Sequence, residues 1–338
     1  MSVGLDIGSK TIKIVELVNE KGRFRLRASG VVAHKGARPE QFKDDKEFAF
    51  LGDVVKKLHK EAKISSREVG IALPEAQVFT RSVKFPTLTD EEIASAVRWE
   101  AEQYIPIPVE DAIVQHQIVE RREDTTPPHV SVLLVAAPKV LVEKYARVVE
   151  AAGLTLFSVE TELIALVRSL APEDQTVMIV DFGAVSTDIA IARNGQLAFS
   201  RSIPTAGEAF TRAVSQSLGI EVAQAEEYKR TYGLSQSQLE GKVKKALDPV
   251  FRMVSDEMKK AIHFYQTEEK GEVPRSVILS GGTAGMPEVA NALTKLLGME
   301  VVAGNPFSKV EVDPEAVKSL AGYAPFYSIA VGLAMRQD

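Results

Sequence analysis

The sequence predicts an α/β fold built from two similar lobes. An Asp-x-Gly motif follows a short apolar strand pattern twice, as Asp6-Ile7-Gly8 and as Asp181-Phe182-Gly183. The two copies lie 175 residues apart in a chain of 338, which is close to half its length. Solenoid repeats have periods of about 20–50 residues, so this spacing favours two lobes instead. Strand and helix patterns alternate around both copies, which is typical of helices that cover the faces of a sheet.

The composition suits a globular protein and excludes several kinds of site. The chain is 45% hydrophobic and 26% charged, with a net charge of −5 that offers no basic surface for nucleic acid. It contains no cysteine, so disulfides, thiolate metal sites and a thiol nucleophile are excluded. No apolar run approaches the roughly 20 residues of a membrane helix, and the N-terminus has no apolar signal core. We therefore expect a soluble protein of the cytoplasm.

The first lobe is expected to open with strands and a helix. Strands are expected over 3–7, 12–18, 24–32, 69–73 and 77–85, with a helix over 48–62. The strand segments are β-branched or alternating, whereas the helical segment repeats its apolar residues on one face. A later strand over 154–159, a helix over 162–170 and a terminal helix over 326–335 complete this lobe. Its predicted extent is 1–86, 154–175 and 324–338.

A compact insert is expected over 87–153. Thr89 and Glu92 form a capping box that announces a helix, and Gly153 suits the end of another helix over 140–152. Strands over 113–120 and 129–137 lie between these helices. Trp99 and Tyr104 are interpreted as ordinary core aromatics of this insert.

The pattern restarts in the second lobe. Strands are expected over 177–180, 188–192, 197–203 and 276–279, and helices over 209–218, 222–230, 238–266 and 287–297. Asn194-Gly195 is a hairpin signal, and the apolar stripe of the long helix is interpreted as core. The predicted extents are 176–206 with 271–323 for the lobe and 207–270 for a helical subdomain.

The repeated motif has a chemistry that fits phosphate binding. A strand that ends in Asp places a carboxylate where α/β folds bind ligands, and the following Gly lets the backbone approach a phosphate. Hydroxyls of Ser9, Thr11, Ser186 and Thr187 can donate to phosphate oxygens, and Lys13 can balance their charge. Carboxylates repel phosphate, so Asp6 and Asp181 imply a Mg²⁺ reached through its water ligands. Either motif alone could be a simple β-turn, but two copies at half-chain spacing disfavour that interpretation.

A glycine-rich loop adds a third element. The strand over 276–279 leads into Gly281-Gly282, and Gly285 follows before a helix. Such a loop lets a flat adenine lie against the backbone, although Gly-Gly turns are also common in proteins that bind nothing.

This order of motifs resembles the actin-like ATPases, and in particular the type IV pilus assembly PilM family, which is related to the cell-division protein FtsA. The resemblance covers the whole chain. Its residues are 4–9, Lys13, Glu16-Leu17, Leu88-Thr89, Glu92-Ile93, 98–106, Arg201, Pro204 and Gly207. It implies an actin-like fold with ribonuclease H-like duplicated lobes, an FtsA/PilM-type inserted subdomain, and ATP with Mg²⁺ in the cleft between the lobes.

The resemblance also implies site residues. The nucleotide ligands expected are Asp6, Gly8, Ser9, Lys10, Thr11, Lys13, Asp181, Gly183, Ser186, Thr187, Gly207, Glu226, Lys229, Gly281, Gly282 and Gly285. Glu226 and Lys229 match a pair that lies along the nucleoside, although their spacing also suits a solvated salt bridge. Relatives often carry Gly-Gly where this chain has Gly207-Glu208. Glu160 and Glu162 are the candidates for a water-activating base, with hydrolysis expected to be weak or absent.

The expected function follows from the same resemblance. It is that of a cytoplasmic ATP-binding scaffold at the inner-membrane platform of a type IV pilus or related secretion machine. Its expected partner is the cytoplasmic N-terminal tail of a PilN-like membrane protein, held by the insert and its neighbouring lobe. Contacts with other platform components and a motor ATPase, and self-association, are left open. Two alternatives are an FtsA-like filament former and, with less support, a sugar or acyl kinase.

Overall fold

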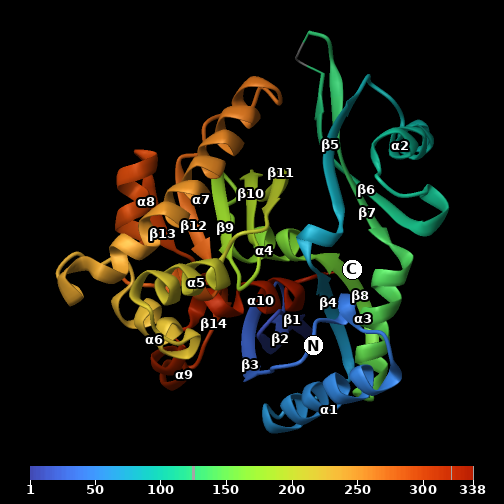
Figure 1. The fold of residues 1–338 in the computed structure, drawn as a ribbon. Helices are drawn as coiled ribbons and strands as arrows, with labels where there is room; N and C mark the ends of the chain where they lie inside the picture. The colour runs from blue at the N-terminus through green and yellow to red at the C-terminus, as the bar shows by residue number, and fades with distance from the viewer. Residues whose placement is uncertain (124–125, 321, 338) are drawn as a thin grey trace.

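The computed structural model describes residues 1–123, 126–320 and 322–337 of the chain (Figure 1). Asp338, the predicted end of the first lobe, lies outside the described residues, as do 124–125 of the predicted insert and 321 of the second lobe. In Figure 1 the first lobe lies low, the helices of the second lobe lie at the left, and a third sheet rises at the upper right.

Each lobe is built on its own sheet, and the two sheets have corresponding strands. In the first lobe the order is β14 (Val310–Glu311), β3 (Arg23–Ala33), β2 (Thr11–Glu20), β1 (Ser2–Ile7), β4 (Glu68–Leu73) and β8 (Thr155–Thr161). In the second it is β11 (Gln196–Ile203), β10 (Thr187–Arg193), β9 (Thr176–Phe182), β12 (Ser276–Ser280) and β13 (Glu300–Ala303). In each lobe an antiparallel meander is extended by parallel strands on the far side of its first strand. The predicted duplication is confirmed.

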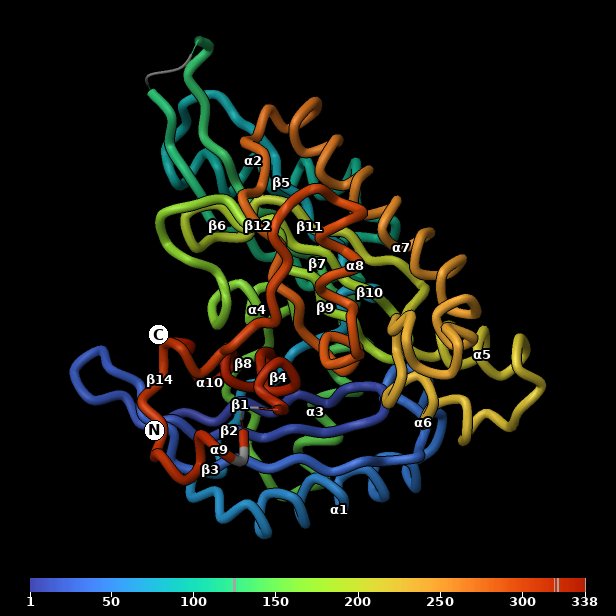
Figure 2. Tube along the Cα trace, turned by 90° about the vertical axis from the view of Figure 1, so that its left-hand side faces the viewer, coloured from blue at the N-terminus to red at the C-terminus, as the bar shows by residue number. Residues whose placement is uncertain are grey.

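Helices cover both sheets. The first lobe carries α1 (Asp45–Glu61), α3 (Lys139–Ala151), α4 (Glu162–Leu170) and α10 (Ser328–Ala334); the second carries α5 (Gly207–Leu218), α6 (Val222–Tyr232), α7 (Lys242–Thr267) and α8 (Val289–Leu297). The apolar stripe of α7 is buried against the second sheet, as expected from its period. Figure 2 shows this arrangement from the side, with α7 running along the edge of the molecule.

The last helix binds the two ends of the chain together. A Cβ atom on Gly4 would overlap the carbonyl oxygen of Ala330, and one on Gly332 would overlap that of Ala165. Only glycine therefore lets α10 approach β1 on one side and α4 on the other. Ser2 Oγ also donates to the carbonyl oxygen of Ala334, so N- and C-terminal segments lie side by side (Figure 2).

The third sheet corrects the predicted extent of the insert. It is formed by β5 (Phe79–Phe85), β7 (His129–Pro138) and β6 (Ala112–Arg122), with α2 (Asp90–Tyr104) beside it. The insert therefore begins before residue 87, because β5 pairs in antiparallel fashion with β7 and so belongs to this sheet. Conversely, α3 lies within 87–153 but shares the core of the first lobe with α1. Because α2 is open to solvent on its outer face, Trp99 is 65% exposed and Tyr104 40%, so the core interpretation of both is wrong.

Local signals mostly locate the elements. The capping box of Thr89 and Glu92 is present, and Gly153 has the left-handed conformation expected after a helix. The long helix starts four residues later than expected, because residues 239–241 form a left-handed turn before it. The short β13, β14 and α9 (Pro314–Leu320) were not predicted, since segments of this length carry little periodic signal. Among the described residues, no helix combines the length and apolar character needed to cross a membrane.

Candidate functional site

The two Asp-x-Gly motifs form the same turn. Gly8 N donates to the carbonyl oxygen of Thr11, and Gly183 N donates to that of Ser186, each at 3.1 Å. A Cβ atom would lie 3.0 Å from the first oxygen and 2.9 Å from the second, so each turn fits glycine best. His34, at the end of β3, holds the first turn through Nε2, which lies 2.9 Å from the carbonyl oxygen of Gly8. The backbone amides of both turns can thus approach an anion from opposite lobes.

The two copies differ at one position that decides their charge. In the first lobe Asp6 is opposite Lys13, and their side chains form an ion pair of 3.0 Å. In the second lobe Asp181 occupies the place of Asp6, and the residue opposite it is Asp188. Asp188 is 2% exposed, and its Oδ1 accepts no hydrogen bond from any described residue. Sequence reasoning missed Asp188, although it follows Asp181 by seven residues as Lys13 follows Asp6.

The resulting row of polar groups is short of positive charge. It crosses four strands of the second sheet, from Ser202 through Asp188 and Asp181 to Ser280. Burial and the charge of Asp188 raise the pKa of Asp181 to about 7, while Lys13 across the cleft acts in the opposite direction. Burial also raises the pKa of Asp188. Such shifts are common where a protein holds like charges together for a ligand.

The two candidate bases have different environments. Glu160 is paired with Arg168 at 2.5 Å and with Arg336 at 3.3 Å, so it fastens α4 to the C-terminal segment. Glu162 begins α4 at the carboxyl end of β8. Burial and the charges of Asp188, Asp6 and Asp181 raise its pKa well above the usual range. Glu162 is thus the candidate whose pKa responds to the carboxylates of the site.

The mouth of the site is closed by an ion pair between the lobes. Gly207 N donates to the carbonyl oxygen of Gly183 at 3.1 Å, which brings the start of α5 against the second turn. The next residue, Glu208, reaches across to Lys10 of the first turn, with 3.3 Å between Nζ and Oε1. Both side chains are substantially exposed. The departure from Gly-Gly at this position therefore places a carboxylate against one of the predicted phosphate ligands.

Glu226 and Lys229 are not a solvated surface pair. Lys229 is 6% exposed, and its Nζ donates to Glu226 at 2.7 Å, to Thr211 Oγ1 at 2.9 Å and to the carbonyl oxygen of Gly207 at 3.1 Å. Burial lowers the pKa of Lys229, and the carboxylate of Glu226 opposes this. The pair thus ties α6 to the first turn of α5, beside the mouth of the site.

The glycine-rich loop lies against the second motif. Gly281 has φ of 81°, and a Cβ atom there would lie 2.8 Å from Asp181 Oδ1 and overlap the carbonyl oxygen of Phe182. Gly282 lies below the ring of Phe326, where a Cβ would come within 3.1 Å. Gly285 has open space around it. The first two glycines are therefore required by close packing, whereas Gly285 is free to face a ligand.

The predicted hydroxyl ligands are not equally available. Thr187 is buried, and its Oγ1 donates to the carbonyl oxygen of Thr205 at 2.7 Å. Ser186 Oγ donates to Asp188 at 2.7 Å and remains partly exposed. Ser9 and Thr11 are also partly exposed in the first turn. Three of the four hydroxyls thus border the cleft, and the proton of Thr187 is committed to the backbone.

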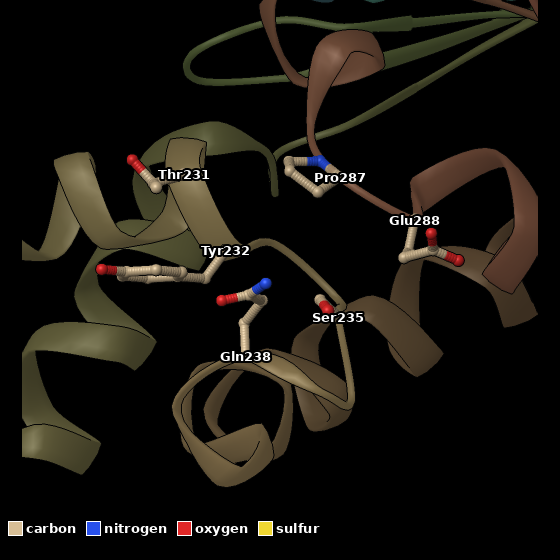
Figure 3. A pocket seen from close by; sticks show the side chains of 6 residues that line it. All are labelled: Thr231, Tyr232, Ser235, Gln238, Pro287 and Glu288. Carbon is tan, nitrogen blue, oxygen red and sulfur yellow. The ribbon is translucent and has the colours of Figure 1, made fainter.

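Two hollows are lined by other residues. One of about 280 Å³ lies between the end of α6, the turn before α7 and the loop before α8, and Figure 3 shows its lining residues Thr231, Tyr232, Ser235, Gln238, Pro287 and Glu288. Its lining residues follow Lys229 of α6 and Gly285 of the glycine-rich loop in the sequence. The other, of about 130 Å³, is here called the α4 groove. Its walls are Gln117 and Val119 of β6, Leu133 of β7, Ile164, Val167 and Arg168 of α4, and 195–197 of the β10–β11 hairpin.

Metal ligation by protein groups alone is not indicated. Within the part of the chain that the structure describes, no three His, Cys, Asp or Glu side chains gather closely enough to hold a metal ion. The carboxylates of Asp6, Asp181 and Asp188 nevertheless supply oxygens, which hard divalent cations prefer.

One family model matches nearly the whole chain. The model of the family described as type IV pilus assembly protein PilM matches residues 4–338. Curated relatives include the cell division protein FtsA of Bacillus subtilis, 24% identical over 90% of this chain and 78% of that protein. FtsA of Pseudomonas aeruginosa is 24% identical over 99% of this chain and 88% of that protein.

Solved structures place the fold in the same group. A PilM-PilN type IV pilus biogenesis complex matches with a TM-score of 0.84 and 28% identity, over 99% of this chain and 98% of that one. The ethanolamine utilization protein EutJ from Carboxydothermus hydrogenoformans has a TM-score of 0.60 at 17% identity, covering 99% and 89%. MreB5 of Spiroplasma citri, bound to ADP, has a TM-score of 0.57 at 15% identity, covering 98% and 94%. The predicted actin-like fold is confirmed.

The raised pKa of Asp181 predicts a pH dependence of stability without ligands. Its pKa is about 7 in the folded chain against an ordinary value of 3.8, so the folded state loses stability as the pH rises from about 4 through 7. Asp181→Asn should remove this penalty and raise the free energy of unfolding at pH 8 by roughly 1–2 kcal/mol, since Asp181 is partly exposed. Urea denaturation at pH 4.5 and pH 8 measures the difference, which should nearly vanish at the lower pH.

The matched control for this prediction is Asp6→Asn. It removes the ion-pair partner of Lys13, so it should lower stability where Asp181→Asn raises it. Equal losses for both variants at pH 8 would contradict the charge imbalance assigned to the second lobe.

Proposed function

The chain belongs to the type IV pilus assembly protein PilM family, and from this premise we propose that it is a nucleotide-dependent scaffold of a pilus assembly platform. In this proposal Mg²⁺ and ATP bind between the lobes, and the cytoplasmic N-terminal tail of a PilN-like membrane protein binds at the insert. The scaffold would act in the cytoplasm and reach the inner membrane through this partner.

The unbalanced carboxylates carry the nucleotide part of the proposal. Asp6 has Lys13 as its counter-charge, whereas Asp188 keeps an unpartnered buried oxygen beside Asp181. Buried charge of one sign is costly unless it is paired. A divalent cation shared with phosphate oxygens would supply the missing charge, and the glycine turns at Gly8 and Gly183 would supply amides for those oxygens. The residues present thus fit Mg·ATP.

The base and sugar would lie along the second lobe. Gly281 and Gly282 pack the loop against the second motif and Phe326, and the carboxylate of Glu226 lies beside the start of α5. Gly285, with open space around it, would face the base. Lys229 supports this region from behind, since its Nζ is committed to Glu226, Thr211 and Gly207.

Hydrolysis is the lesser part of the proposal. Glu162 is the group placed to activate a water, because its carboxylate is influenced by Asp6, Asp181 and Asp188. Burial and the neighbouring like charges disfavour the ionised form of Glu162, and the neutral form is a poor proton acceptor, so we expect slow turnover.

The α4 groove carries the partner part of the proposal. It lies where the insert meets the first lobe, and its walls combine the apolar side chains of Val119, Leu133 and Ile164 with the guanidinium of Arg168. Because the guanidinium of Arg168 already donates to Glu160 and to the carbonyl oxygen of Gly332, a short extended peptide would bind mainly by placing one apolar side chain against those apolar walls. A PilN partner is also present in the solved complex that this chain resembles, at 28% identity.

Calorimetry with Mg·ATP tests the nucleotide site. Wild type should bind, and both Asp6→Ala and Asp181→Ala should lose more than about tenfold in affinity, because each removes a charged group worth about 1.5 kcal/mol or more. Glu160→Gln, which alters a carboxylate outside the site, is the control and should bind as wild type does. Retained affinity in both aspartate variants would remove the basis of the assignment.

The ion pair at the mouth predicts a gain in affinity. Glu208→Gln should free Lys10 for the phosphates and tighten Mg·ATP by about two- to fivefold, the range expected for an exposed pair. The same calorimetric titration at low salt measures the effect. Glu227→Gln, which removes an exposed carboxylate on the neighbouring helix, controls for net charge and should change the affinity less. A loss of affinity in Glu208→Gln would show that this carboxylate supports the nucleotide instead.

The α4 groove is tested with a peptide of the partner's tail. Val119→Arg places a charged side chain in the groove and should weaken the synthetic N-terminal tail of a PilN-type partner by at least about tenfold. His116→Arg, an exposed change on the same strand, adds the same charge outside the groove lining and should leave binding intact. Unchanged affinity in Val119→Arg would place the peptide elsewhere.

A further inference from the structure

A buried carboxyl group stands where the two lobes and the insert meet. Glu75 opens the single turn (Glu75–Gln77) that links β4 of the first lobe to β5 of the insert. Its side chain is 5% exposed. This same turn packs against β11 of the second lobe, so Glu75 borders all three parts. None of the proposed steps in nucleotide or peptide binding uses it.

The surroundings of Glu75 join the same three parts through hydroxyl groups. Thr161 belongs to the first lobe, Thr80 to the insert and Ser200 to the second lobe, and all three lie close enough to lower the pKa of Glu75. Burial and the charge of Asp188 outweigh them and raise that pKa to about 7. Yet neither Glu75 Oε2 nor Thr80 Oγ1 forms a hydrogen bond with any described residue. The contact between the first lobe and the insert is therefore incomplete at this point.

The phosphate site reaches Glu75 by two routes. The backbone N–H of Glu75 donates to Glu162 Oε2 at 3.3 Å. The charges of the site carboxylates act on Glu162 in turn. The charge of Asp188 acts on the Glu75 carboxyl directly through the protein interior. Interactions between charged groups are strong where water is excluded from between them.

We propose that Glu75 is a positioning residue through which a nucleotide–cation complex between the lobes tightens the insert against the first lobe. A divalent cation beside Asp181 and Asp188 reduces the negative potential at Glu75. This favours the ionised form of the carboxyl group, which accepts more strongly from its hydroxyl neighbours, among them Thr80 Oγ1 of the insert. The turn and the start of β5 become firmer, next to the insert that holds the proposed peptide groove.

This inference rests on the proposed nucleotide site and adds a direction of regulation to it. Coupling between two sites is reciprocal, so a tail peptide that favours the tightened insert also favours bound nucleotide. Allosteric coupling of this kind is commonly about five- to 150-fold in affinity. The proposed coupling between nucleotide and tail peptide is positive, because tightening of the insert would favour the binding of both.

Hydrogen exchange of the full chain tests the coupling without the peptide. Saturating Mg·AMP-PNP should slow the exchange of the amides of residues 75–85 at least about threefold in wild type. In Glu75→Gln, which keeps size and removes the charge, this difference should disappear while calorimetry shows nucleotide affinity within about threefold of wild type. Thr80→Val, which removes the hydroxyl on the insert side, should behave in the same way.

The control variant is Glu40→Gln, which changes a partly buried carboxylate beside Arg38 and α3, away from the junction. It should keep the wild-type response, and unfolding curves verify that all variants are folded. Persistence of the exchange difference in Glu75→Gln and Thr80→Val overturns the inference. So does nucleotide binding to wild type without any change in residues 75–85, which leaves the proposed function standing. Failure of wild type to bind nucleotide overturns both.

Discussion

The structure depends on an electrostatic imbalance at the facing edges of its two lobes. Each lobe ends its first strand in an aspartate, but only the first lobe places a lysine opposite it. The single positive charge of Lys13 must therefore serve Asp6 and, across the cleft, Asp181. Asp188 and Glu162 add further buried or half-buried carboxyl groups, whose pKa burial raises. A protein keeps such an arrangement at the expense of stability, and in the proposed function a cation held with phosphates would resolve it.

The architecture holds these groups in place from behind. Apart from the extra edge strand β14, the two sheets have corresponding strand orders, so the turns at Gly8 and Gly183 occupy equivalent places in the two lobes. The close contacts of α10 with β1 and α4, which glycine alone permits, fix the first sheet relative to the segment that carries Glu162. Lys229 does the same for the second lobe by binding the first turn of α5 from below. The groups near the charges are thus held by close packing and buried hydrogen bonds, whereas Lys10 and Glu208 are exposed.

The insert lies where it could report the state of the proposed nucleotide site. Its sheet leaves the first lobe at Glu75 and meets the second lobe at β11, so it touches both sides of the cleft. The α4 groove lies at this same meeting point. A ligand that changes the contact between lobes must act on a groove formed from pieces of both, and this geometry explains why a scaffold would use such a fold.

The sequence by itself determined the duplication, most strands and helices and the turn glycines, because these depend on local spacing and periodicity. It also contained the signal for Asp188, at the same offset from Asp181, but the change from lysine to aspartate hid the equivalence. Only the tertiary structure decided that β5 leaves the first lobe, that Glu208 reaches Lys10, that Lys229 is buried and that Trp99 is exposed. Each of these depends on segments far apart in the chain meeting in space, and no local pattern records which partner a strand edge, a charge or an aromatic ring will find.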